Sequence, residues 1–125
     1  MKFEWITDWE TIWAEPFQTR WLDWMENAQN THVFFHPAMA RAWVDTYMPL
    51  RDIRPLFCIA TQGENTIFLP LVLWKKNWKN AFEKAIVPIG YSDYDYHDPV
   101  VVGMPNLELF WADFPREIKN NQNIN

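Results

Sequence analysis

The residues best suited to do chemistry gather in one stretch, Gly90 to Val102. Its carboxylates and imidazole are residue types that ligate metals or transfer protons, and its tyrosines offer flat faces that suit sugars or amino-acid side chains. Successive side chains of an extended chain point to opposite faces, so Asp95 and His97 could point together. The candidate site residues are Tyr91, Asp93, Tyr94, Asp95, Tyr96, His97 and Asp98.

Three roles are open for this stretch. A structural role as a polar surface beside a sheet comes first, because clustered acids also occur in structural networks. Contact with a substrate comes second. A metal comes last and is not expected, because loops that bind hard cations normally contain a glycine at the sharp turn and a catalytic zinc site needs a second histidine.

The other reactive residue types offer weaker candidates. His36 precedes Pro37 and has no carboxylate beside it in the sequence, which favours a turn or capping role over that of a base. Cys58 is the single cysteine and lies in an apolar run, so we expect a buried thiol. No spacing of Ser, His and Asp or of Cys and His supports an activated nucleophile, and the catalytic residues stay unassigned.

Helices are expected in the N-terminal part of the chain. Thr7 and Glu10 stand in the spacing of a capping box, which predicts a short helix with Thr7 as its N-cap. Apolar residues at helical spacing predict a second helix from about Pro16 to Ala28. A third helix should begin at Pro37 and be stopped by Pro49.

Strands are expected after these helices. Leu56 to Thr61 and Thr66 to Trp74 are apolar and β-rich, and the turn residues between them predict an antiparallel hairpin. Pro70 cannot donate to a ladder, so it should mark an edge or a bulge. Ala85 to Ile89 should form a further strand, and the valines from Val100 another.

The order of elements predicts an α+β fold with helices packed on a largely antiparallel sheet. A last helix should be capped by Asn106 and should end or kink near Pro115. We expect one domain, residues 1–119, followed by a polar tail, residues 120–125, which lacks the apolar residues to build a core.

Charge and composition exclude several functions. The 125-residue chain has a net charge of −5 and no long run of Lys or Arg, which argues against a nucleic-acid partner. No segment is long and apolar enough for a membrane span, and the acidic start does not resemble a signal peptide. With one cysteine, a reducing and cytoplasmic location is the simpler expectation.

Nine tryptophans in a chain of this length need an explanation. Those at helical spacing are expected in the core: Trp9, Trp13, Trp21, Trp24 and Trp43. Those expected to form an exposed patch are Trp74, Trp78 and Trp111.

Several features together resemble a known family. They are the Trp-rich leading helix, Phe34-Phe35-His36-Pro37 followed by Ala42-Trp43, the strand Phe68-Leu69-Pro70-Leu71, and Asp98-Pro99-Val100 after a strand that ends at Gly90. In this order they resemble the N-terminal half of acyltransferases of the CelD/BcsL type, a FemAB-like group of the GNAT superfamily. The resemblance runs from about Trp9 to Phe114.

The resemblance implies the acceptor side of an N-acyltransferase that moves an acetyl group from acyl-CoA to an amine. Acetyl-CoA or another acyl-CoA would bind to a second GNAT-like half or another subunit, because no glycine-containing pyrophosphate loop is present here and no cofactor is expected on this segment. The chain alone is then expected to be inactive. Two alternatives stay open: a small carbohydrate- or peptide-binding module that uses exposed aromatics, and an interaction or dimerisation domain.

Overall fold

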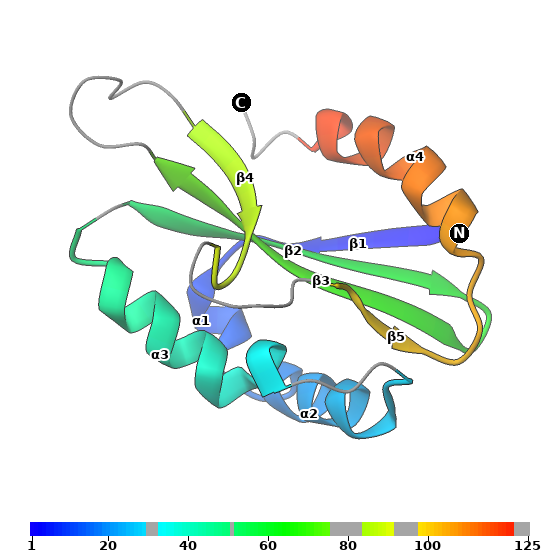
Figure 1. Ribbon diagram of the computed structural model, residues 1–125, viewed down its shortest axis with the longest axis horizontal. Coiled ribbons are helices and arrows are strands. Elements are labelled where there is room, and N and C mark those ends of the chain that lie inside the picture. The colour runs from blue at the N-terminus through cyan, green and yellow to red at the C-terminus, as the bar shows by residue number, and fades with distance from the viewer. Residues whose placement is uncertain (30–32, 51, 76–83, 92–97, 122–125) are drawn as a thin grey trace.

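The computed structural model describes residues 1–29, 33–50, 52–75, 84–91 and 98–121. Within them the chain has the expected α+β fold, in which helices α1–α3 cover one face of an antiparallel five-stranded sheet and α4 covers the other (Figure 1). The strands are β1 (Lys2–Ile6), β2 (Ile53–Gln62), β3 (Asn65–Lys75), β4 (Lys84–Pro88) and β5 (Val100–Val102). The helices are α1 (Trp9–Ile12), α2 (Phe17–Asn27), the 3₁₀ turn η1 (Val33–Phe35), α3 (Pro37–Tyr47) and α4 (Leu107–Asn120).

The strands follow the order β1-β2-β3-β4, and β5 also pairs with β3. The expected hairpin is confirmed as β2 and β3, which pair from Ile53 opposite Trp74 to Gln62 opposite Asn65. Strands β4 and β5 follow one another along the second edge of β3. Pro88 lies opposite Leu71 and Val100 opposite Phe68, so Leu69 and Pro70 face the gap between the two strands.

This gap explains how β3 accommodates Pro70. The expectation that Pro70 marks an edge or a bulge is wrong on both counts. Strand β3 has partners on both sides, and its one-to-one pairing with β2 continues through Pro70 opposite Phe57. The carbonyl of Pro70 accepts a hydrogen bond from the Ile89 amide at 2.9 Å. The N–H and C=O of a strand residue point to the same side, so the missing N–H of Pro70 faces the gap and costs no ladder bond.

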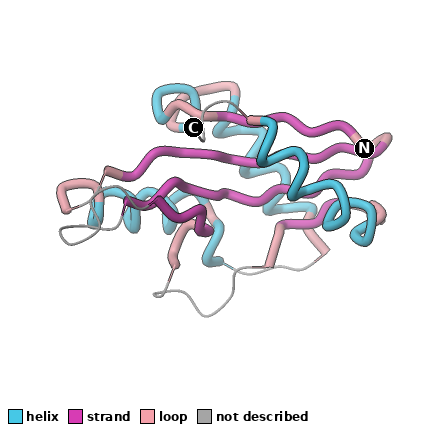
Figure 2. The backbone as a smooth tube through the Cα atoms, turned by 90° about the horizontal axis from the view of Figure 1, so that it is seen from above, coloured by secondary structure: helices cyan, strands magenta, loops and turns pink. Residues whose placement is uncertain are grey.

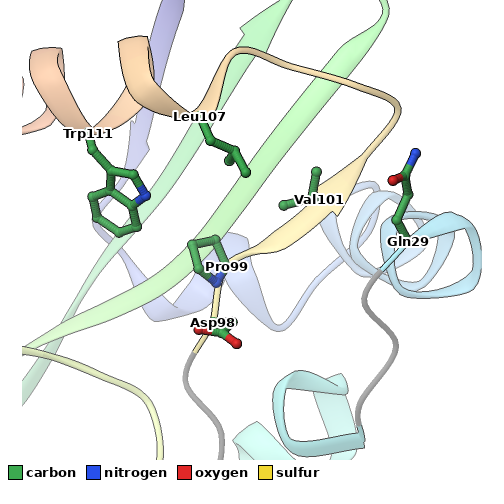
Figure 3. Close-up of a pocket in the computed structure, with 6 residues that line it drawn as sticks. All are labelled: Gln29, Asp98, Pro99, Val101, Leu107 and Trp111. Atoms are coloured by element: carbon green, nitrogen blue, oxygen red, sulfur yellow. The ribbon is translucent and has the colours of Figure 1, made fainter.

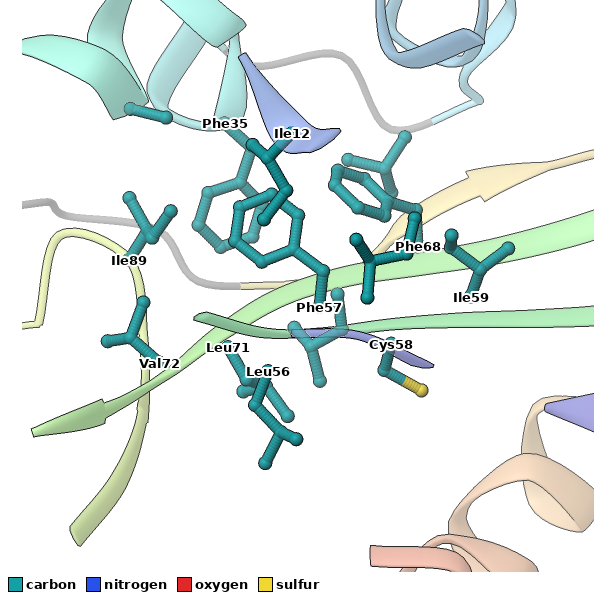
Figure 4. Close-up of a cluster of buried hydrophobic side chains, with 14 of the residues drawn as sticks. Ile12, Phe35, Leu56, Phe57, Cys58, Ile59, Phe68, Leu71, Val72 and Ile89 are labelled. Carbon is teal, nitrogen blue, oxygen red and sulfur yellow. The ribbon is translucent and has the colours of Figure 1, made fainter. Parts of the chain in front are cut away.

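The core between the sheet and α1–α3 is dominated by aromatic rings. Phe57 and Phe68 from the sheet meet Phe17 and Trp21 from α2, with ring centroids 5.4 to 6.3 Å apart. All four rings are almost fully buried. The buried indole N–H of Trp21 donates to the carbonyl of Phe35 at 2.8 Å, so the ring is packed without leaving its polar atom unsatisfied. Figure 4 shows part of this core, with Phe57 and Phe68 on the side of α1–α3, and also buried side chains on the opposite face of the sheet, among them Leu56 and Cys58.

A smaller core lies under α4, which crosses the strands on the other face (Figure 2). Phe110 is fully buried and stacks on Phe3 of β1 at 5.7 Å, and Phe114 contacts Trp5 at 6.1 Å. Ile118 packs on the core one turn later. Of the two outcomes expected near Pro115, an end or a kink, the end is wrong, because the helix continues to Asn120 with Pro115 inside it. Pro115 has no N–H to donate within the helix, but the packing of Phe114 and Ile118 on the core stabilises the turns before and after it.

The helix starts test the capping predictions. Thr7 is not the N-cap of the first helix: Asp8 is, and its carboxylate accepts from the Thr11 amide. The capping roles of His36 and Asn106 are confirmed, since His36 accepts from the Ala38 amide and Asn106 from the Leu109 amide. The second helix begins within a residue of the prediction, at Phe17.

Two further expectations are wrong or incomplete. Trp74 is not exposed: it is buried against Trp43 and Tyr47 of α3, with ring centroids 5.4 Å away from each. Of the tryptophans expected in the core, Trp9 and Trp13 are only half-buried. Strand β1 was not anticipated. Trp78, which was expected in the exposed patch, and the end of the polar tail, at 122–125, lie outside the described residues.

Candidate functional site

Three segments that are distant in sequence are held together beside β5. The end of α2 is joined to β5 by the Gln29 amide, which donates to the Val101 carbonyl at 2.9 Å. The start of α4 is joined to the β2–β3 turn, because Asn65 accepts from the Met104 amide and Gln62 from the Asn106 amide. Gly103 permits this approach with a φ of 80°, in the left-handed region that glycine tolerates.

These segments line an open pocket of about 420 Å³, here called the β5 pocket. Leu107 and Trp111 extend from α4 toward Pro99 and Val101, and Gln29 lies at the opposite end from Trp111 (Figure 3). Asp98 contributes its carboxylate beside Pro99. The volume falls within the range of small-molecule sites, which combine apolar walls with a few polar groups.

Trp111 gives the pocket an accessible aromatic wall. Its side chain is 49% exposed, although Phe110 and Phe114 hold its ring from within at centroid distances of 4.8 and 5.8 Å. Leu107, one turn earlier, is 42% exposed. A braced but accessible indole can stack on a sugar ring or attract a cation through its π-face. The expectation that Trp111 is exposed is therefore confirmed.

The structure brings one predicted site residue, Asp98, to this pocket. Tyr91 does not line it: its ring lies 6.3 Å from that of Trp74 in an edge-to-face contact. The other predicted residues lie outside the described residues, namely Asp93, Tyr94, Asp95, Tyr96 and His97.

Sequence reasoning missed Gln29 and Leu107 as pocket residues. No local pattern in the sequence connects either residue with Asp98. Sequence signals existed for Asp98, as a reactive residue type, and for Trp111, as an aromatic residue expected in an exposed patch. The remaining members could be found only from the pairing of β5 with β3 and from the hydrogen bonds that place α2 and α4 beside it.

Cys58 does not contribute a nucleophile. Its side chain is buried on the α4 face of the sheet, as expected from its apolar neighbours (Figure 4). Burial raises the pKa of the Cys58 thiol, and the carboxylate of Glu117 on α4 raises it further. The thiol therefore stays protonated, whereas nucleophilic and metal-binding cysteines act as thiolates.

The N-terminus of α4 is where a helix could bind a phosphate, but three backbone amides at this end already have acceptors within the chain. The amides of Met104, Asn106 and Leu109 donate to Asn65, Gln62 and Asn106, respectively. Among the described residues, no group of three or more His, Cys, Asp or Glu residues is close enough to hold a metal. Nor does this part of the chain contain a helix with the length and hydropathy needed to cross a membrane.

Comparison of the chain with models of protein families, with curated proteins and with solved structures finds no match. The geometry of the β5 pocket and the sequence motifs are therefore the basis for a functional proposal.

Proposed function

We propose that this chain is the acceptor-side half of a GNAT-like N-acyltransferase and that it holds an amine-bearing acceptor in the β5 pocket. The observation that carries the proposal is the pairing of the Asp98 carboxylate with the exposed ring of Trp111 in one cavity. Asp98, Pro99 and Val100 are also residues on which the family resemblance depends. A second GNAT-like half or another subunit would bind acyl-CoA.

The chemistry of the pocket suits an ammonium group on a small apolar or sugar-like body. A carboxylate attracts the ammonium, the indole face of Trp111 adds a cation–π interaction, and the amide of Gln29 can bond to a hydroxyl group. Acyl transfer needs the neutral amine, whereas the pocket suits the charged ammonium form. We therefore assign to the pocket the binding of the acceptor and not its deprotonation. The general base stays unassigned.

The proposal includes a cytoplasmic location, where the single thiol needs no disulfide partner. It also includes the two-part active site. The acyl-CoA of a complete enzyme would contribute the thioester, and this chain would contribute only the position of the acceptor.

Nuclear magnetic resonance of ¹⁵N-labelled protein tests acceptor binding directly. Glucosamine should shift the indole N–H signal of Trp111 and the amide signal of Asp98, whereas glucose should bind about tenfold more weakly, because it lacks the charged amine. Trp111→Ala should abolish the response. Tyr91→Ala is the matched control, since it removes an aromatic ring of similar exposure outside the pocket and should leave binding unchanged.

Two other results would overturn the proposal. Equal binding of glucosamine, glucose and N-acetylglucosamine would favour the carbohydrate-binding module, which the exposed Trp111 also supports. Saturable binding of acetyl-CoA to this chain alone would contradict the proposal that acyl-CoA binds to a second half or another subunit.

An interaction domain is the second candidate that a specific observation favours. Met104, Leu107 and Trp111 form an exposed apolar strip at the start of α4, and Met104 is 85% exposed. If this strip mediates dimerisation, sedimentation should show a dimer that Met104→Ser weakens. A monomer at all concentrations, with no response to amines, would reject both functions.

A further inference from the structure

A second cavity, of about 320 Å³, lies within the layer formed by α1, α2 and α3. Trp13 follows α1, Gln18 and Leu22 come from α2, and His36 and Arg41 come from the start of α3. It shares no lining residue with the β5 pocket. We call it the helical-layer pocket, and its function is independent of the acyltransferase proposal.

The hydrogen bond of His36 determines which ring nitrogen is available to a ligand. Its Nδ1 accepts from the Ala38 amide at 3.1 Å, so in the neutral ring the proton must be on Nε2. Nε2–H is then a donor. The capping role therefore fixes both the tautomer and the orientation of the imidazole, which is half-buried at the wall of the cavity.

Arg41 supplies a positioned cation on the same wall. Its guanidinium carbon lies 4.7 Å from the ring centroid of Trp13, and its Nε bonds to Asp45 at 3.2 Å. Both partners of this ion pair are more than half exposed, so the pair is weak and easily competed. The terminal nitrogens of the guanidinium still provide the fork that matches a carboxylate.

The rest of the wall is suited to a flat apolar body. Trp13 is stacked on Trp9 at a centroid distance of 5.4 Å and an interplanar angle of 4°, which fixes its ring. Leu22 is 44% exposed and lines the same cavity. The Gln18 amide donates to the Ile12 carbonyl at 2.8 Å, so its oxygen is the part that can accept from a ligand.

We propose that the helical-layer pocket binds a small monocarboxylate with a planar apolar body. The carboxylate would accept from His36 Nε2 and from the Arg41 guanidinium. The body would lie against Leu22 and the edge of Trp13, because Trp9 and Arg41 lie against the faces of that ring. A single formal cation, partly offset by Asp45, suits a monoanion better than a phosphate dianion, which would need more positive charge.

The test uses indole-3-acetate and its neutral isostere indole-3-acetamide with the ¹⁵N-labelled chain. Indole-3-acetate should shift the indole N–H signal of Trp13 in a saturable manner, and the acetamide should bind about tenfold more weakly. Equal binding of the two compounds, or no saturable shift with either, would overturn the proposal. Tighter binding of phenyl phosphate than of phenylacetate would overturn the choice of a carboxylate.

Two variants separate binding from folding. His36→Asn keeps a side-chain acceptor at the N-cap but removes the Nε2 donor, and Arg41→Gln removes the cation from an exposed position. Each should weaken indole-3-acetate binding by roughly three- to tenfold while the thermal unfolding midpoint stays close to that of the unmodified chain. Tyr91→Ala, which removes an exposed aromatic ring outside both pockets, is the control and should bind indole-3-acetate normally. Unchanged affinity in both pocket variants would contradict the assignment.

Discussion

At the scale of a single residue, the carboxylate of Asp8 caps the N-terminus of α1. It accepts from the Thr11 hydroxyl at 2.7 Å and from the Thr11 amide at 2.9 Å. These bonds, the hydroxyl bond first, lower the pKa of Asp8 below its ordinary value of 3.8. A pKa lowered by folding stabilises the folded chain at pH values above the unfolded pKa, and this contribution disappears as the pH falls through the folded pKa.

Asp8→Ala should therefore reduce the free energy of unfolding by about 1 kcal/mol at neutral pH, because the cap is lost. The difference from the unmodified chain should shrink as the pH falls through the lowered folded-state pKa of Asp8, because both states then bind the proton. Urea denaturation at a series of pH values from neutral to acidic measures this change. Asp8→Asn, which keeps a capping oxygen, is the control, and a difference independent of pH would contradict the cap assignment.

Cys58 permits a second prediction at the residue scale. Because its thiol is buried and its pKa is raised by burial and by Glu117, alkylation by iodoacetamide should be slow in the folded chain and fast in denaturant. Raising the pH from 7 to 9 should accelerate alkylation of the folded chain much less than that of a denatured sample. Equal acceleration in the two samples would show that the thiol is accessible.

At the scale of elements, the turns are determined by glycines whose surroundings differ. Gly63 and Gly103 both have positive φ values, 64° and 80°. A Cβ at Gly63 would meet open space, whereas one at Gly103 would collide with the Asn65 side chain that holds the start of α4.

Gly63→Ala should lower the free energy of unfolding by about 1 kcal/mol, the cost of the left-handed backbone alone. Gly103→Ala should cost roughly 2 to 4 kcal/mol, because it adds a steric clash to that strain. Thermal unfolding of the pair measures the difference. Gly103→Ala should also weaken ligand binding in the β5 pocket, since Leu107 and Trp111 depend on the start of α4. Equal costs for the two variants would contradict the close contact at Gly103.

The sequence predicted the elements that depend on local signals. The turn residues at Gln62 to Asn65 identified the β2–β3 hairpin, and Pro37 and Asn106 identified the starts of α3 and α4. It failed where the outcome depends on distant partners. Pro70 is accommodated by the gap between β4 and β5, and Pro115 by packing on β1, and neither partner is close in sequence.

The same reasoning applies to the β5 pocket. Asp98 was predicted because reactive residue types cluster around it, whereas Gln29 could be placed there only through the bond between its amide and Val101. Strand β1 was not predicted, because the local pattern at the N-terminus indicates only the start of a helix near Thr7. Its pairing with β2 from Lys2 opposite Thr61 to Ile6 opposite Phe57 is a long-range contact with no local signature.

At the scale of the whole molecule, the sheet separates two cores of unequal size. The aromatic core under α1–α3 contains Phe17, Trp21, Phe57 and Phe68, whereas the single fully buried side chain of α4 is Phe110. The α4 layer should therefore be the first part of the described fold to open, because regions with less buried apolar contact open at lower free energy.

Phe110→Ala should lower the free energy of unfolding by about 3 to 5 kcal/mol and should also accelerate alkylation of Cys58 under native conditions, because α4 covers that face. Phe17→Ala is the matched control in the other core. It should cost a similar amount but expose Cys58 only through global unfolding. Identical alkylation rates in two variants of equal stability would show that α4 does not open separately.

The end-to-end placement of β4 and β5 along β3 also determines where the chain can change without losing its fold. Strand β4 ends at Pro88 opposite Leu71 and β5 begins at Val100 opposite Phe68, so both ends of the intervening connection are fixed on the same edge of β3. Doubling the length of this connection would cost roughly 0.6 kcal/mol in loop-closure entropy, and no strand register would shift. The connection between Ile89 and Asp98 can therefore be exchanged by design on an unchanged frame, which offers a route to a new ligand specificity beside Asp98.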